Sequence, residues 1–431
     1  MDRGASIRRG RPTVLVVAFY FPPSTVAGTF RTLRFVKYLA GFGWTPRVIT
    51  TWPKGSLRVD PQLMREVPCG VEVIHIPHIN LRPPARKAAG GDHKPILHSR
   101  LRRFVGELLR TPDIDAGWLP FALPLVVREA LRPDVRAIYT TGPPFGTHLL
   151  GLLARAITRK PWLADFRDPW TRNPASPHRS PLLACLATWL ESSVARSADA
   201  LVAVTEPLAQ RLAALRPRSA PVVIPNGYDP AHFAGLSPLP ADQFTLTYAG
   251  SLYAIHRPEA FLKGVRQFLD SNGGGRPVQV LFVGSGFHQY ESLVRELDLD
   301  GTVRSTGPLP HGALLRTLVS SHALIEFLTG DERVDPCIPC KLYEYLAARR
   351  PILMLARPGA AADLVRASGV GEVVPPDDPA AVAAALDRMY TRYAQWRDVE
   401  SDGAVLKEHQ AEALTGRLAA LLDSLAEGSA A

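Results

Sequence analysis

The 431-residue chain contains only four cysteines, which excludes a fold built on a disulfide framework. No apolar run reaches the ~18 residues that span a bilayer, so we expect no transmembrane helix. The basic N-terminus is followed by a short apolar segment, 14–21, without a small-residue cleavage site. We interpret that segment as a first strand and not as a signal peptide, and we expect a cytoplasmic protein.

Acidic residues are fewer than basic ones, and the formal net charge is +10. This excess favours anionic partners such as nucleotide diphosphates, lipid phosphates or an anionic membrane surface. No Lys/Arg tract alternates with aromatic residues and no zinc-finger pattern is present, so we do not expect a nucleic-acid partner. Surplus arginines that are simply solvated remain an alternative explanation of the charge.

Strands and helices alternate in both halves of the chain, which predicts two α/β domains with parallel sheets. The expected strands begin near residues 14, 47, 71, 137, 162, 200 and 222, and then near 245, 278, 303, 323, 352 and 371. A segment rich in proline, 229–242, predicts a linker. We therefore expect an N-terminal domain over 12–232, a C-terminal domain over 243–395, and a helix and tail over 396–431 that pack back on the N-terminal domain.

Ligands of such doubly wound sheets bind outside the carboxyl ends of the strands. A cleft between the two domains is therefore the default site. Residues 77–97 predict a mobile loop because they are rich in proline and glycine. Residues 97–109 predict an amphipathic helix with a basic face, which fits either a membrane-surface helix or an ordinary docked helix.

The segment 337–355 predicts a loop, a short helix and a buried strand. Pro339 suits a helix start, and Leu342, Tyr345 and Leu346 recur at helical spacing. The N-terminus of a helix binds phosphate through its unpaired N–H groups. Lys341 adds a positive charge there and Glu344 can accept hydrogen bonds from a sugar diol. A helix start with a favourable first-turn acid is the purely structural alternative.

Four further segments place polar residues at strand ends. They are the glycine loop around Gly28 and Arg31, the turn from Gly142 to His148, the segment Asp165–Phe166–Arg167–Asp168, and the loop from Gly250 and Ser251 to Arg257. Three charged side chains that end an apolar strand at 165–168 must be paired, because an unpaired buried charge is costly.

Together these segments resemble retaining GT-B glycosyltransferases of the family-4-like, group 1 type, over most of residues 12–395. The resemblance implies two Rossmann-like domains that face a central cleft, with a nucleotide-diphospho-sugar as co-substrate and neither a cofactor nor a metal. It implies that Glu344 binds the donor ribose and that Gly28 faces the donor's phosphates and sugar. The implied donor-binding residues are Gly28, Gly250, Ser251, Arg257, Gly284, Lys341, Leu342 and Glu344.

This chain departs from the family pattern at three places. Gly142 stands near the position of the family's functional His, and His148 follows one loop later. Ser251 replaces an Arg, while Arg257 stands at the position of a Lys. The Glu-x7-Glu pair is incomplete, because Pro336 stands eight residues before Glu344, with Asp335 beside it.

We expect Asp168, His148, Arg257 and Lys341 to be catalytic, and Arg31, Asp165, Arg167 and Asp168 to line the acceptor side. His148 and the Arg–Asp residues can also be explained as structural. The predicted reaction transfers a sugar to a hydroxyl of a sugar or lipid-linked acceptor, in the synthesis of cell-envelope polysaccharide or glycolipid. Peripheral binding at the inner face of the plasma membrane is compatible with this reaction. Alternatives are a nucleotide-binding protein without turnover and a sugar-nucleotide epimerase. We do not expect Cys337 and Cys340 to bind metal, because no second pair accompanies them.

Overall fold

The structure is a computed structural model that describes residues 10–53, 59–79, 106–108, 111–171, 180–239, 242–253, 255–271, 277–330, 332–393 and 403–428. The chain divides into two compact units. Unit 1 comprises Met1–Pro225 and Leu414–Ala431, and unit 2 comprises Asn226–Ala413. The chain thus passes from unit 1 to unit 2 and returns to unit 1 for its last helix.

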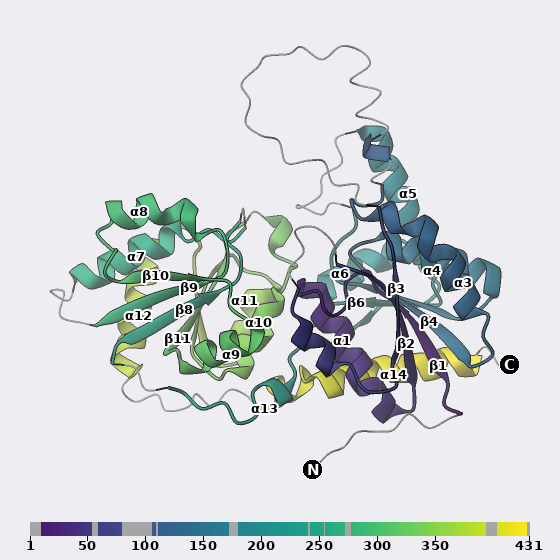
Figure 1. The fold of residues 1–431 in the computed structure, drawn as a ribbon. Coiled ribbons are helices and arrows are strands. Elements are labelled where there is room, and N and C mark those ends of the chain that lie inside the picture. Colours follow the sequence, from purple (N-terminus) through teal and green to yellow (C-terminus); the bar gives the residue numbers. More distant parts are fainter. Residues whose placement is uncertain are drawn as a thin grey trace. The chain divides into compact units, whose positions relative to one another are not determined.

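Unit 1 is built on a seven-stranded parallel sheet with the order β3-β2-β1-β4-β5-β6-β7 (Figure 1). Its order reverses between β1 and β4, so the sheet grows outward in both directions from its centre. The strands are β1 (Thr13–Val17), β2 (Thr45–Thr51), β3 (Glu72–Ile76), β4 (Val135–Gly142), β5 (Trp162–Phe166), β6 (Ala200–Ala203) and β7 (Val222–Val223).

Alternating residues of β1 supply the two hydrophobic cores of unit 1, because successive side chains of a strand point to opposite faces. Val14 and Val16 pack with helices α1 (Ala27–Leu39) and α14 (Ala411–Gly428). Leu15 and Val17 pack with the helices of the other face. These are α3 (Leu119–Ala130), α4 (Gly146–Thr158), α5 (Pro181–Ser197) and α6 (Glu206–Ala213).

Unit 2 is built on a six-stranded parallel sheet with the order β10-β9-β8-β11-β12-β13 (Figure 1). The strands are β8 (Phe244–Ala249), β9 (Val278–Val283), β10 (Val303–Gly307), β11 (Ala323–Leu328), β12 (Ile352–Ala356) and β13 (Gly371–Val374). The predicted class of two Rossmann-like parallel-sheet domains is thereby confirmed.

Helices cover both faces of this second sheet. Phe244, Ile325 and Leu353 face the core formed with α7 (Glu259–Asp270), α8 (Glu291–Glu296) and α12 (Pro379–Tyr393). Leu324 and Ile352 face the core of the remaining helices. These are α9 (His311–Ser320), α10 (Cys340–Ala347), α11 (Ala360–Ala367) and α13 (Gly403–Glu408).

Two helices of the structure were not predicted, and one predicted helix differs from the structure. Helix α3 was not expected, since its apolar residues are almost continuous and Pro124 lies inside it. The single helix expected within the C-terminal segment 396–431 is two helices, α13 and α14, separated at His409 and Gln410. The α11 helix also lacked a prediction.

Most of the predicted loop 77–97 and of the predicted amphipathic helix 97–109 lies outside the described residues, although 106–108 are helical. Within the described part of the chain, none of the helices has the length and apolar character needed to cross a bilayer.

Candidate active site

Two glycine-containing loops form the carboxyl edge of the sheet in unit 2. Gly250 follows β8 with φ +136°, and Gly284 follows β9 with φ +143°. A Cβ on Gly284 would lie 1.9 Å from the carbonyl oxygen of Gly250, so the two backbones touch in a way that only glycine permits. Ser251 and Ser285 join the same loops through their hydroxyl oxygens, 2.8 Å apart.

A buried ion pair lies directly beneath the Gly250 turn. Lys341 Nζ is 3.0 Å from Glu326 Oε1 and 3.8 Å from the centre of the Tyr248 ring. A Cβ on Gly250 would lie 3.2 Å from the same Nζ. The Tyr248 hydroxyl donates to the carbonyl of Ser251 at 3.2 Å. The ammonium of Lys341 is therefore held against the underside of the loop.

Burial governs the ionisation of this cluster. It raises the pKa of Glu326 and lowers that of Lys341, and each partner opposes the shift of the other. Burial likewise lowers the pKa of His256 to about 3, helped by the charge of Lys341. His256 is therefore neutral, and its Nδ1 contacts the carbonyl oxygen of Phe327.

Helix α10 brings Lys341 and Glu344 to this edge. Pro339 is its N-cap residue, so the helix begins one residue later than its proline. Leu342 and Tyr345 are fully buried. The Tyr345 hydroxyl accepts from Ala249 N at 2.7 Å and donates to Ile325 O at 3.2 Å, which attaches α10 to the end of β8 and the middle of β11.

Glu344 lies on α10 with its carboxylate against α9. Its Oε1 is 3.0 Å from Nε2 of His311, the first residue of α9. The Glu344 side chain is 13% exposed and His311 is 15% exposed, so both reach the surface. His311 was not predicted from the sequence, because its position relative to Glu344 depends on how α9 and α10 pack.

Arg257 is exposed and stands in the loop that follows β8. Its backbone N–H donates to Thr329 Oγ1 and its Nη2 donates to Thr329 O, each at 3.1 Å. Thr329 follows the end of β11, so Arg257 belongs to the same edge of the sheet as Gly250.

The structure places Arg31 and Asp165 in one fully buried network of unit 1. Arg31 donates from Nε and Nη2 to the two carboxylate oxygens of Asp165, at 2.9 and 2.8 Å. Tyr139 and Thr141 donate to the same carboxylate at 2.7 and 2.9 Å. Arg31 also donates to Ile224 O and Pro225 O. The network therefore joins α1, β4 and β5 to residues 224–225, where the chain leaves unit 1.

Burial alone would raise the pKa of Asp165, but Arg31 and the hydroxyl donors outweigh it and hold that pKa below its usual value. Asp165 is an ionised carboxylate with no exposed surface. Arg31 is 4% exposed. Two of the four predicted acceptor-side residues, Arg31 and Asp165, thus serve this internal network, and their contact with an acceptor stays a prediction.

Arg167, in contrast, lies against the glycine loop. Its Nε donates to Gly142 O at 3.3 Å and its Nη2 contacts Pro143 O. A Cβ on Gly28 would lie 1.6 Å from Arg167 Nη1, so only a glycine there leaves room for this guanidinium. The structure thereby brings together three of the predicted segments, those of Gly28, Gly142 and Arg167.

Asp168 is half-buried beside Arg167, after the end of β5. Burial raises its pKa to about 6, although the charge of Arg167 pulls in the other direction. A carboxyl group with such a pKa exchanges protons near neutral pH, as a general base must.

His148 is completely buried in the core of unit 1. Its Nδ1 is 2.8 Å from Thr140 Oγ1, and its ring stacks on Phe166 at 4.5 Å. Burial lowers its pKa to about 3, so the ring is neutral. Its Nε2 faces Gly142, where an added Cβ would approach to 2.8 Å. A catalytic role for His148 stays a prediction, and its position supports the Gly142 turn.

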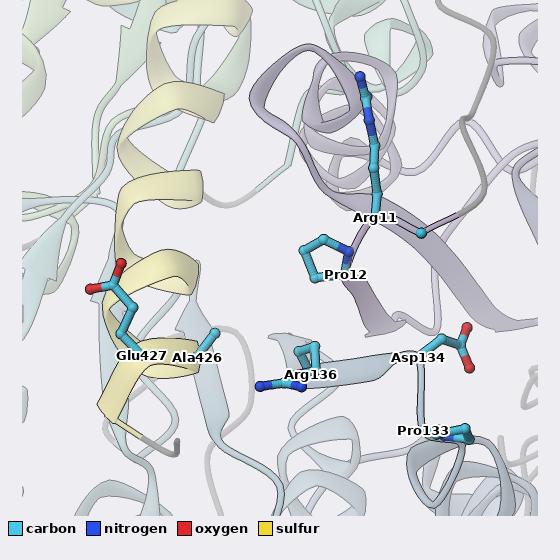
Figure 2. Close-up of a pocket in the computed structure, with 8 residues that line it drawn as sticks. Arg11, Pro12, Pro133, Asp134, Arg136, Ala426 and Glu427 are labelled. Carbon is cyan, nitrogen blue, oxygen red and sulfur yellow. The ribbon is translucent and has the colours of Figure 1, made fainter. Parts of the chain in front are cut away.

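The remaining candidates are distributed around the same edges. Asp335 pairs with Arg357 at 3.4 Å. Cys337 and Cys340 are half-buried, and Cys340 Sγ accepts from Asn226 Nδ2 at 3.3 Å. An open hollow in unit 1 lies at the opposite edge of the sheet, where β1 and β4 begin (Figure 2). Its lining includes Pro12, Arg136 and Ala426 and none of the predicted site residues.

Comparison with protein families gives two adjacent matches. Residues 27–227 match the model of a glycosyl transferase 4-like domain. Residues 243–392 match the model of glycosyl transferases group 1. Together the matches cover most of both units. The chain belongs to the family-4-like, group 1 glycosyltransferases. A search of curated proteins gave no significant match.

Solved structures of glycosyltransferases have the same fold as this one. A glycosyltransferase of Rickettsia africae matches with a TM-score of 0.63 at 14% identity, over 96% of this chain and 99% of the other. A sucrose-phosphate synthase of Thermosynechococcus elongatus gives 0.66 at 17%, over 98% and 100%. HepE of Anabaena, crystallised with UDP and glucose, gives 0.58 at 15%, over 97% and 98%. The predicted GT-B fold is thus confirmed.

Proposed function

We propose that this glycosyltransferase transfers a sugar from a nucleotide-diphospho-sugar to an acceptor hydroxyl, with retention at the anomeric carbon and without a metal. The observation that carries the proposal is the edge of the sheet in unit 2. There the Gly250 turn, the Lys341 ammonium beneath it and the Glu344 carboxylate belong to adjoining elements. HepE, which shares the fold, was crystallised with UDP-glucose, and this supports a donor of that chemical class.

The donor's diphosphate would lie on the Gly250 turn. Glycine lets a ligand come close to the backbone there, because it has no side chain to keep the ligand away. Transfer releases a nucleoside diphosphate, so negative charge develops on the departing phosphate. Arg257 would contact that phosphate directly, since its guanidinium is exposed and can bind two oxygens at once. Lys341 would add its charge from below the turn.

Glu344 would accept hydrogen bonds from the donor ribose. Its Oε1 is already oriented by His311, which reduces the freedom that the carboxylate loses on binding. The other donor-binding assignments follow the same edge, with Ser251 and Gly284 in the two touching loops. Leu342 has no exposed side chain, so it contributes by fixing α10 in place.

Asp168 would be the base that receives the acceptor's proton. Its pKa, about 6, suits that task. Arg167 would keep the carboxylate charged and orient it, as the charged neighbour that lowers its pKa. Gly28 would provide the close backbone approach beside Arg167.

The proposal is tested by mixing the protein with a panel of nucleotide-diphospho-sugars and measuring released nucleoside diphosphate. NMR of the product's anomeric proton then reports retention. We expect one class of donor to be consumed, and we expect chelators of divalent metals to leave the rate unchanged. Loss of activity in the chelator would contradict metal independence, and an inverted anomer would contradict retention.

The role of Glu344 is tested in the same assay by Glu344→Gln. The loss of a charge-assisted hydrogen bond, about 1.5–3 kcal/mol, should raise the donor's KM roughly 10- to 150-fold. Glu296→Gln, a change of the same kind at an exposed residue of α8, is the matched control. An unchanged donor KM in Glu344→Gln would remove the carboxylate from the donor site.

Ser251 favours a second candidate, a GT-B protein that binds nucleotide without turnover. Ser251 stands where the family has a phosphate-binding Arg, and its hydroxyl bonds to Ser285. Nucleotide binding without consumption of any donor would establish that alternative. A free epimerised sugar nucleotide as product would establish the epimerase instead.

We further propose that the acceptor belongs to cell-envelope polysaccharide or glycolipid synthesis, with the protein in the cytoplasm at the inner face of the plasma membrane. The support is the net charge of +10, which favours an anionic surface. Flotation with vesicles of phosphatidylglycerol, against vesicles of phosphatidylcholine as control, tests this. Equal recovery with the two vesicles would contradict it.

A further inference from the structure

Glu326 is a charged residue in the middle of an apolar strand. β11 reads Ala-Leu-Ile-Glu-Phe-Leu, and all six residues are buried. Glu326 has no exposed surface. A carboxylate at such a position is costly unless a cation and hydrogen bonds compensate it. The structure supplies Lys341 at 3.0 Å and the backbone N–H of Phe327 at 3.0 Å.

The two charges of the Lys341–Glu326 pair lie at different places in unit 2. The cationic end lies at the Gly250 turn, where a Cβ would come within 3.2 Å of Lys341 Nζ, and the anionic end lies within β11. Tyr248 covers the ammonium with its ring face, at 3.8 Å, and the Tyr248 hydroxyl supports the same turn. Each contact of Lys341 therefore fixes its ammonium beneath the backbone on which the diphosphate would rest.

We propose that Glu326 is the positioning residue of the donor site, which keeps the Lys341 ammonium charged and seated under the Gly250 turn. This inference rests on the proposed function, because it assumes that the donor's diphosphate binds at that turn. Glu326 acts through Lys341 and does not itself touch the donor.

The alternative is that the pair only stabilises unit 2. A buried ion pair is weak support for stability, because the desolvation of two charges offsets most of their attraction. Because this pair lies at the Gly250 turn, its Lys341 ammonium can attract a diphosphate there, which an ion pair elsewhere in the sheet could not do. A structural role and a positioning role also differ in their effect on the pH dependence of binding.

The groups that face Lys341 decide this pH dependence. Glu326 comes from β11, Tyr248 from β8 and His256 from the loop after β8, while Tyr345 of α10 interacts with Glu326. His256 is neutral, since its pKa is about 3. Burial raises the pKa of Tyr248 and Tyr345 far above neutral pH, so both are neutral too. Glu326 is the carboxylate that opposes the effect of burial on Lys341.

The experiment is calorimetric titration with four nucleoside diphosphates (UDP, GDP, ADP and dTDP) between pH 7 and 10. It compares the wild type with Glu326→Gln, Lys341→Met and the double variant. Above pH 7 the second ionisation of the terminal phosphate is nearly complete, so the ligand's charge is almost constant. We expect the wild type to bind one nucleotide until Lys341 loses its proton at high pH.

In Glu326→Gln we expect Lys341 to lose its proton, and nucleotide affinity to fall, at a pH at least about one unit lower than in the wild type. At a fixed pH within the range where affinity is falling, this shift corresponds to about tenfold weaker binding. Lys341→Met should bind roughly 10- to 150-fold more weakly than the wild type, as for a lost charge-assisted contact. In the Lys341→Met background, Glu326→Gln should have no further effect on the pH profile.

An unchanged pH profile in Glu326→Gln, with tight binding and a lower melting temperature, would overturn the inference and leave the proposed function intact. Absence of binding by the wild type to all four nucleotides would instead overturn the proposed function. If Glu326→Gln does not fold, the double variant removes both charges and restores neutrality. The double variant must then bind as weakly as Lys341→Met, and wild-type affinity in it would overturn the inference.

Discussion

Asp165 and Glu326 are both fully buried carboxylates on strands, yet their pKa values move in opposite directions. Asp165 receives hydrogen bonds from Arg31, Tyr139 and Thr141, and these outweigh burial. Glu326 has one cation and one backbone donor, and burial prevails. Its Oε2 has no hydrogen-bond partner among the described residues. The Asp165 carboxylate is therefore fully compensated by its donors, while the Glu326 carboxylate is compensated only in part, so its ionisation depends more strongly on Lys341.

Asp165→Asn tests the structural network. The change leaves Arg31 buried without its counter-charge, which should lower the free energy of unfolding by about 3–5 kcal/mol. Chemical denaturation measures it. Asp270→Asn is the matched control, because Asp270 pairs with Arg266 at 2.6 Å but is 64% exposed. That control should change stability by less than about 1 kcal/mol. Equal effects of the two variants would contradict the network's importance.

The pKa of Asp168 predicts a pH profile. Burial raises it to about 6, so the basic form prevails above pH 6 and the protonated form below. We expect kcat/KM to fall as pH falls through about 6, and Asp168→Asn to lose both activity and this step. Stability depends on pH in the opposite direction. Because the raised pKa of Asp168 disfavours ionisation in the folded state, its contribution to the free energy of unfolding falls as pH rises from about 4 to about 6. A rate independent of pH between 5 and 7 would contradict the assignment.

The sequence predicted that the charges at 165–168 must be paired, and the structure pairs Asp165. The choice of partner was not predictable, because Arg31 stands 134 residues away along the chain. Arg167, the nearer arginine, instead binds the carbonyls of the Gly142 turn. Glu326 and His311 were missed for the same reason. Their partners come from other elements and no short spacing marks them.

At the level of elements, the contact between the loops after β8 and β9 determines the shape of the donor edge. The substitution Gly284→Ala tests this, since it would place a Cβ 1.9 Å from Gly250 O at a residue whose φ is +143°. We expect a loss of stability of about 1–3 kcal/mol from the backbone alone, and weaker nucleotide binding. Thermal unfolding and calorimetry measure both.

Gly301→Ala is the control for Gly284→Ala in the same unit. A Cβ on Gly301 would meet nothing within 4 Å, so the substitution should be nearly neutral. Nucleotide affinity that is equal in Gly284→Ala and the wild type would show that the shape of these loops does not matter for binding.

Elements with clear periodicity were predictable and elements without it were not. The helix at 340–347 was expected from Leu342, Tyr345 and Leu346, which are all buried. Helix α3 was missed because a continuous apolar sequence with internal Pro124 has no helical period to detect. Its burial between α4 and the sheet overrides the weak local preference.

At the scale of the whole molecule, the chain returns to unit 1 after completing unit 2. Leu414, Leu418 and Leu422 of α14 lie in the same core as Val14 and Val16 of β1. Trp44 also donates to Asp423 at 2.8 Å. The two parallel sheets were predictable, since alternating strands and helices allow few other arrangements. The structure supplies the strand order and the packing partners of each helix, which depend on contacts between distant residues.

The central claim is that a nucleotide diphosphate binds at the edge formed by the Gly250 turn, the Gly284 loop and the start of α10. The most direct test is hydrogen–deuterium exchange of the intact protein with and without the four nucleoside diphosphates. We expect one nucleotide to slow exchange at residues 250–253, 284–286 and 340–345, and to leave exchange at Arg11 and Arg136, which line the hollow of unit 1, unchanged. Protection elsewhere, with none at these three segments, would contradict the account.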